Sequence, residues 1–232
     1  FSKARANTWQ NPRGGFIHAM HRHHWGGYHY RITGKNSTGE VVYEGGWQNN
    51  RQMGMHPNHR MVENIREELD APGEWYLDPK TNLLYFMPPN ASDLPTALVE
   101  TAQLKHLVEF VGSSKKPVHH VSLKGFIFRH TARTFMETRE PLLRSDWTIY
   151  RGGAIVFQNA EHCGLQNCEL DQLGGNGIFV NKYNRHINIS GCHLHHCGAS
   201  GICFVGDPKS VRSPKFEYGQ TNDYEEIDRE KG

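Results

Sequence analysis

The chain has 232 residues, of which 37% are hydrophobic and 22% are charged, so it is long enough for one large domain or two small ones with a real core. Its 26 basic and 24 acidic residues are spread along the chain and give a net charge of +2, so neither nucleic acid nor an anionic membrane is expected as the main partner. No run of 18 apolar residues is present, so no membrane span is predicted. Because the chain starts at Phe1 without a Met and ends in a polar tail, we expect it to be a piece of a longer protein.

Residues 1–100 are predicted to form an antiparallel β-rich region with one short helix. The stretches "YHYRITG" and "EVVYEGG" have the character of strands, and "GEWYLDPKTNLLYFMPP" is typical of a hairpin, with two aromatic-rich strands around a turn. The segment "ENIREELD" is rich in helix-forming residues and ends before "APG", so the short helix is placed there.

Five histidines crowd into residues 18–34, at His18, His21, His23, His24 and His29. A metal site is conceivable, but neither an H-E-x-x-H motif nor paired carboxylates accompany them, and alternating histidines are typical of an exposed strand face. We therefore interpret these histidines as structural or sugar-contacting, and predict no metal ion and no cofactor.

A repeat of 24 residues follows. "HCGLQNCELDQLGGNGIFV" begins at His162 and "HINISGCHLHHCGASGICF" begins at His186, and the two align without a gap over their whole length. An earlier copy begins at His120, breaks off at Thr131 and resumes at residues 152–157. Short β-prone stretches that return with this period predict an all-β solenoid, a right-handed parallel β-helix over residues 101–205 with three strands per coil. Residues 132–151 are then an excursion loop, and residues 206–232 are a loop or tail leading to further coils.

The repeat also predicts which side chains face inward. Equivalent residues on successive coils are strand neighbours about 4.8 Å apart, so they form files along the solenoid. The register places the cysteines in inward files, where they are expected to act as small buried hydrophobic residues rather than as zinc ligands or disulfides. Asp171 and His195 share an outward position on adjacent coils, beside the excursion.

The excursion loop carries residues suited to gripping a sugar or a uronate. It contains carboxylate, guanidinium and aromatic side chains, among them Glu137, Arg144, Asp146 and Trp147. Loops that project from a rigid β-helix are a natural place for a substrate groove, because the coils determine where their side chains point. The alternative is an ordinary solvated loop with one packed tryptophan.

Several long motifs, "GMHPNHRMVEN", "ELDAPGEWYLDPKTNLLYFMPP", "REPLLRSDWTIYRGGA" and "GASGICFVGDP" among them, together resemble the right-handed β-helix proteins of glycoside hydrolase family 141. The resemblance covers nearly the whole chain. It implies a bacterial enzyme that is extracellular or periplasmic and acts on plant cell-wall glycans. That family includes α-L-fucosidase and xylanase activities, so the resemblance selects no particular sugar.

Glycoside hydrolysis needs two carboxyl groups on either side of the scissile bond. We predict Asp171 as the first catalytic carboxylate, with Asp207 second and Asp146 third. Arg144, His195, His196, Glu137 and Trp147 are the predicted substrate contacts. The alternative for Asp171 is that it simply caps the turn "DQLGGN", since Asp is a common turn residue.

Three functions are compatible with these patterns. The leading one is a glycoside hydrolase acting on a complex, plant cell-wall polysaccharide. The second is a polysaccharide lyase, in which Arg or Lys removes a proton beside a uronate, and the third is a glycan-binding β-helix without catalysis. The sugar, the stereochemical outcome and the oligomeric state are left open.

Overall fold

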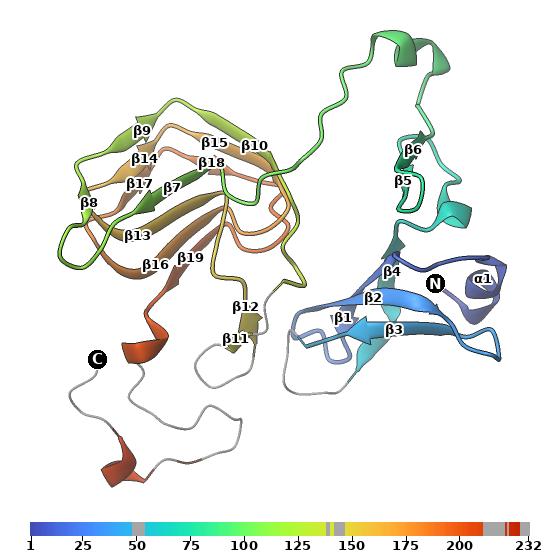
Figure 1. Ribbon diagram of the computed structural model, residues 1–232, viewed down its shortest axis with the longest axis horizontal. Coiled ribbons are helices and arrows are strands. Elements are labelled where there is room, and N and C mark those ends of the chain that lie inside the picture. Colours follow the sequence, from blue (N-terminus) through green and yellow to red (C-terminus); the bar gives the residue numbers. More distant parts are fainter. Residues whose placement is uncertain (48–53, 138–139, 142–146, 211–220, 222, 228–232) are drawn as a thin grey trace. The chain divides into compact units, whose positions relative to one another are not determined.

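The computed structural model describes residues 1–47, 54–137, 140–141, 147–210, 221 and 223–227. The chain divides into two compact units, Phe1–Val99 and Glu100–Gly232, shown in Figure 1. Each unit has a hydrophobic core of its own. None of the helices in the described part of the chain is long and apolar enough to cross a membrane.

The first unit is built on a four-stranded antiparallel sheet in the order β3-β2-β1-β4. Its strands are β1 (Phe16–His21), β2 (Gly27–Lys35), β3 (Val41–Gly45) and β4 (Met55–Glu63). Alternate residues of β1 and β2 are buried, as expected for a sheet with one face on a core. Helix α1 (Lys3–Thr8) contributes Ala6 to this core, and Trp9 follows it into the same cluster.

The remainder of the first unit is a hairpin and two short 3₁₀ turns. Strands β5 (Trp75–Asp78) and β6 (Leu83–Phe86) pair antiparallel, where the aromatic-rich sequence predicted a hairpin. The 3₁₀ turns are η1 (Arg66–Glu68) and η2 (Ala91–Thr96).

The short helix predicted in "ENIREELD" is wrong in extent, because the structure has only the single turn η1 there. Its acidic side chains bind the N-terminal segment: Glu68 accepts from the indole of Trp9 at 2.5 Å, and Glu67 accepts from the backbone N–H of Gln10 at 2.8 Å. The true helix, α1, begins after Ser2, whose hydroxyl accepts from the N–H of Arg5 at 3.1 Å. This hydroxyl satisfies one of the free amides that every helix start exposes.

A histidine on β2 makes the stability of the first unit depend on pH. Burial lowers the pKa of His29 from 6.5 to about 4, and the neighbouring His18 acts in the same direction. Between these two values the unfolded chain binds a proton that the folded chain does not, so stability falls as the pH falls. We expect the unit to lose about 2 kcal/mol of unfolding free energy between pH 7 and pH 5.

Urea unfolding of the chain and of the variant His29→Gln at these two pH values tests this expectation. The variant should lose less stability on acidification, because Gln does not titrate. An equal loss in both proteins would show that another group is responsible.

The second unit is a parallel β-helix, in which successive coils stack and their strands form three parallel sheets, as shown in Figure 1. The first sheet contains β7 (Val108–Val111), β13 (Ile155–Glu161), β16 (Ile178–Arg185) and β19 (Ile202–Val205), with β8 (Val118–His119) beside β13. The second contains β9 (Ser122–Lys124), β14 (Gly164–Gln166) and β17 (Asn188–Ser190). The third contains β10 (Ile127–Thr131), β15 (Glu169–Leu173) and β18 (His193–Leu194).

The register confirms the 24-residue repeat. Leu165 pairs with Leu123 on one side and Ile189 on the other, and all three belong to the core or pack against it. Leu170 lies in the same way between Phe128 and Leu194. The five cysteines are free thiols, and Cys163 and Cys168 are buried in this core, as their inward register predicted.

The corners of the coils repeat as strictly as the strands. At each corner the chain turns through a left-handed backbone conformation, with φ of +48° to +73°, in three files: His120, His162 and His186; Gly125, Asn167 and Gly191; His130, Gln172 and His196. Such φ values are uncommon outside glycine, so a residue that adopts them at the same place in every coil marks a required turn. His196 occupies one of these corners, directly after the outward His195.

The excursion begins at the corner of the coil that follows β10 in the third sheet. It leaves after β10, where the hydroxyl of Thr131 accepts from the N–H of Gly174 at 2.9 Å and the N–H of Thr134 donates to the carbonyl of Gly174 at 3.1 Å. Within it, β11 (Glu140–Pro141) pairs antiparallel with β12 (Thr148–Ile149). After β19 the described chain continues into the 3₁₀ turns η3 (Pro208–Ser210) and η4 (Tyr224–Glu226).

Candidate functional site

Asp171 lies on the outer side of β15, where it meets residues from the coils on both sides. Its Oδ1 lies 2.8 Å from Nδ1 of His196 and 3.2 Å from Nδ1 of His195. Its Oδ2 lies 3.5 Å from the guanidinium of Arg129, its register partner on β10. The side chain is only 10% exposed, so these groups surround most of the carboxylate.

The surroundings favour the ionised form of Asp171. The hydrogen bond with His196 is the main cause that lowers the pKa of the carboxyl, and the charges of His195 and Arg129 act in the same direction against the effect of burial. Asp171 is therefore a carboxylate at neutral pH, the form that a nucleophile or a general base requires. Because its oxygens face side chains rather than the amides of the following turn, turn capping does not describe its role.

A second carboxylate is joined to Asp171 through one imidazole. Nε2 of His195 lies 3.2 Å from the carboxylate of Glu169, while Nδ1 of the same ring faces Asp171. Glu169 and Asp171 are two positions apart on β15, so they project from the same face of the sheet. Glu169 is 42% exposed at its side chain and is the more accessible of the two carboxylates.

The structure brings together Asp171, His195 and His196 from the predicted set, and it adds Glu169 and Arg129. The sequence analysis named neither of these two residues as part of the site, although the repeat aligns Arg129 with Asp171. Both residues could have been found in the sequence. In "CELD", Glu169 lies two positions before Asp171, and residues two apart on a strand share a face. Arg129, in "FIFRH", could have been found from the alignment itself.

The other predicted residues lie elsewhere or outside the described residues. Glu137, at the start of the excursion, forms an ion pair with Lys105 at 2.6 Å. Trp147 is half-buried and directly precedes β12. Asp207 follows β19 of the first sheet, and its carboxylate accepts from the N–H of Lys209 at 2.9 Å. Arg144 and Asp146 lie outside the described residues.

Asp171, His195 and His196 could also hold a cation, since one ligand atom from each lies within 4.8 Å of the others. However, the guanidinium of Arg129 already places positive charge beside the same carboxylate. A second cation would be repelled by it, so we interpret the cluster as a hydrogen-bonded set around an ionised Asp171.

Comparison with known proteins bears on the fold of the second unit. The family described as the right handed beta helix region matches residues 143–213. A solved structure named "Glycoside hydrolase" is similar to this chain with a TM-score of 0.61 at 17% sequence identity. The similarity covers 80% of this chain and 37% of the other, so the chain spans well under half the length of that protein. A search of the curated proteins found no match.

These similarities and the parallel sheets together confirm the predicted fold class, a right-handed parallel β-helix. At 17% identity the likeness to the solved structure is one of fold.

Proposed function

We propose that this protein is a glycoside hydrolase that acts on a complex polysaccharide of the plant cell wall. The observation that carries the proposal is the ionised Asp171 joined through His195 to a second carboxylate, Glu169, on the outer face of the β-helix. Two carboxyl groups that flank one glycosidic bond are the usual requirement of this reaction. The similar fold of a solved protein named "Glycoside hydrolase" supports the same class.

The two carboxylates are assigned different roles. Oδ1 of Asp171 lies 2.8 Å from His196 and 3.2 Å from His195, whereas Oδ2 has a longer contact of 3.5 Å with Arg129. Oδ2 is therefore assigned as the oxygen that activates a water molecule. Glu169, whose carboxyl group lies 3.2 Å from Nε2 of His195, is assigned as the acid that delivers a proton to the oxygen of the leaving sugar. His195 and Arg129 position Asp171 and keep it ionised.

The position of His195 favours inversion of the anomeric carbon. Its Nδ1 lies 3.2 Å from Asp171 and its Nε2 lies 3.2 Å from Glu169, so a whole imidazole ring separates the two carboxyl groups. A separation of this size suits the range of roughly 6.5–9.5 Å typical of inverting enzymes. A retaining enzyme needs its carboxyl groups closer, at about 5–5.5 Å. The proposal therefore includes a water molecule between Asp171 and the sugar ring, and no covalent intermediate.

The substrate and the location of the enzyme are part of the same proposal. A polymer of the cell wall lies outside the cell that degrades it, so the protein is proposed to be extracellular or periplasmic in a bacterium. The reaction needs no cofactor, because proton transfer between two carboxylates and water is sufficient. The described start of the excursion, residues 132–137, is proposed to form one wall of the substrate groove, because Thr134 bonds Gly174, three residues beyond Asp171.

Incubation with a panel of plant cell-wall polysaccharides tests the proposal. We expect new reducing ends from at least one of them, and proton NMR of the first products should show an inverted anomer. Products that absorb in the ultraviolet, lost on chelation, would instead indicate a polysaccharide lyase. Binding by calorimetry without new reducing ends would indicate a glycan-binding β-helix, and retained configuration would contradict the assigned spacing.

A further inference from the structure

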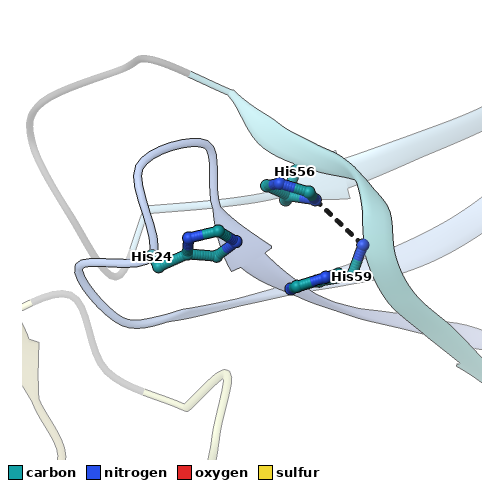
Figure 2. A group of neighbouring side chains, drawn as sticks. All are labelled: His24, His56 and His59. Atoms are coloured by element: carbon teal, nitrogen blue, oxygen red, sulfur yellow. Dashed lines mark hydrogen bonds between the residues drawn. The ribbon is translucent and has the colours of Figure 1, made fainter.

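Three histidines from separate parts of the first unit meet on its surface. His24 lies in the loop between β1 and β2, and His56 and His59 lie near the start of β4. Figure 2 shows the three rings facing a common space. Their centroids are 4.5 Å apart for His24 and His56, 4.8 Å for His24 and His59, and 4.4 Å for His56 and His59. One ligand nitrogen from each ring lies within 4.8 Å of the others.

An irregularity in the pairing of β1 with β4 creates this arrangement. Ala19 pairs with Arg60 and His21 pairs with Met55, so the segment from His56 to His59 bulges away from β1. The bulge places both histidines of "HPNH" on the side of the loop that carries His24. The N–H of Arg22 donates to the carbonyl of Gly54 at 3.2 Å, which ties the loop to the start of β4. Backbone contacts of the β1–β2 loop and of β4 therefore hold the three histidines close together.

We propose that His24, His56 and His59 form a binding site for a zinc ion. Imidazole nitrogen is a preferred ligand of zinc, and three histidines with an open fourth position are a known zinc ligand set. Such an ion would crosslink the β1–β2 loop to β4. The proposal is independent of the proposed glycosidase activity, whose residues all lie in the other unit.

The cluster lies where an ion can enter. Metal binding uses the lone pair of one nitrogen from each imidazole. His24 and His59 are exposed and His56 is half-buried, so an ion can reach all three rings from solvent.

The geometry indicates which part of the site must move. A tetrahedral zinc ion with Zn–N bonds of about 2.0–2.1 Å holds its nitrogens roughly 3.4 Å apart. The ligand nitrogens lie within 4.8 Å of one another, so they must close by at most about 1.4 Å. His56 has a further constraint, because its Nδ1 accepts from the N–H of Asn58 at 3.1 Å and of His59 at 3.0 Å. When His56 binds the zinc ion, its Nδ1 can no longer accept these two hydrogen bonds. We therefore expect the turn from His56 to His59 to be the segment that rearranges.

Zinc titration of the untagged chain, with an indicator in competition, tests the site. We expect His24→Ala, His59→Ala and His56→Asn each to weaken binding of one zinc ion by about 100-fold or more. Asn at position 56 is chosen because its side-chain oxygen can accept from the same two amides, so the turn is kept while the imidazole is lost. Zinc should also raise the unfolding midpoint of residues 1–99, and EDTA should reverse the effect.

His23→Ala is the matched control, since His23 lies in the same loop but outside the cluster. This variant should bind zinc as the unchanged chain does. NMR should also show the amides of Asn58 and His59 shifting on addition of zinc. The proposal is overturned if the unchanged chain binds no zinc, if the three variants bind it equally well, or if His23→Ala loses it.

Discussion

Replacing Asp171 by Asn is expected to lower kcat by at least about 1,000-fold on the polysaccharide that the protein hydrolyses. The amide has nearly the shape of the carboxylate but cannot accept a proton from water. Because the substitution removes charge and little volume, the unfolding midpoint should move by only a few degrees. Reducing-end assays at saturating substrate and thermal unfolding followed by circular dichroism measure the two effects.

Two further variants make this result specific. Glu169→Gln should also reduce kcat strongly, and most for substrates with poor leaving groups, because Glu169 is assigned as the proton donor. Glu161→Gln is the matched control: it removes a carboxylate from the first sheet, where Glu161 bonds the hydroxyl of Tyr183. Full turnover by Asp171→Asn would remove Asp171 from the mechanism, and equal losses from Glu161→Gln would indicate a general effect of charge.

Replacing Leu165 by Ala is expected to destabilise the β-helix by about 4 kcal/mol, within the range of about 2–5 kcal/mol for fully buried leucines. Leu165 is 0% exposed and lies between Leu123 and Ile189 in an inward file. The neighbouring coils constrain both sides of the cavity, so the site can collapse little. Urea unfolding followed by circular dichroism measures the loss.

The control is Ile127→Ala on β10, where the isoleucine is 64% exposed. This variant should change the unfolding free energy by less than about 0.5 kcal/mol. The transition of residues 1–99 provides an internal reference, because that unit has a separate core. A small loss for Leu165→Ala, or a shift of both transitions together, would contradict the stacked-coil packing.

The architecture of the second unit was predictable because a solenoid repeats its local environment. Each 24-residue copy of the pattern specifies the same strands and corners, and in-register pairing such as Ile178 with Ile202 follows directly from the period. The outward position shared by Asp171 and His195 followed from the same register, which is why the sequence analysis brought these two residues together.

The first unit has no repeat, and there the sequence was less informative. "ENIREELD" has helical propensity over eight residues, yet only Arg66–Glu68 forms a turn, because contacts to the segment that follows α1 hold its glutamates. The histidines of residues 18–34 do not act as one group. His18 bonds His29 and Glu63, His21 is buried beside Trp25, and His24 joins two histidines that lie more than 30 positions away.

By itself the sequence determined the period, the β-helix, the inward files and Asp171 as the leading carboxylate, because all of these depend on local pattern and register. Only the tertiary structure decided which side chains surround that carboxylate and that Glu169 shares an imidazole with it. It also decided that a bulge in β4 brings His56 and His59 to His24. Side-chain contacts of this kind depend on rotamers, bulges and packing between distant segments, and no periodic signal encodes them.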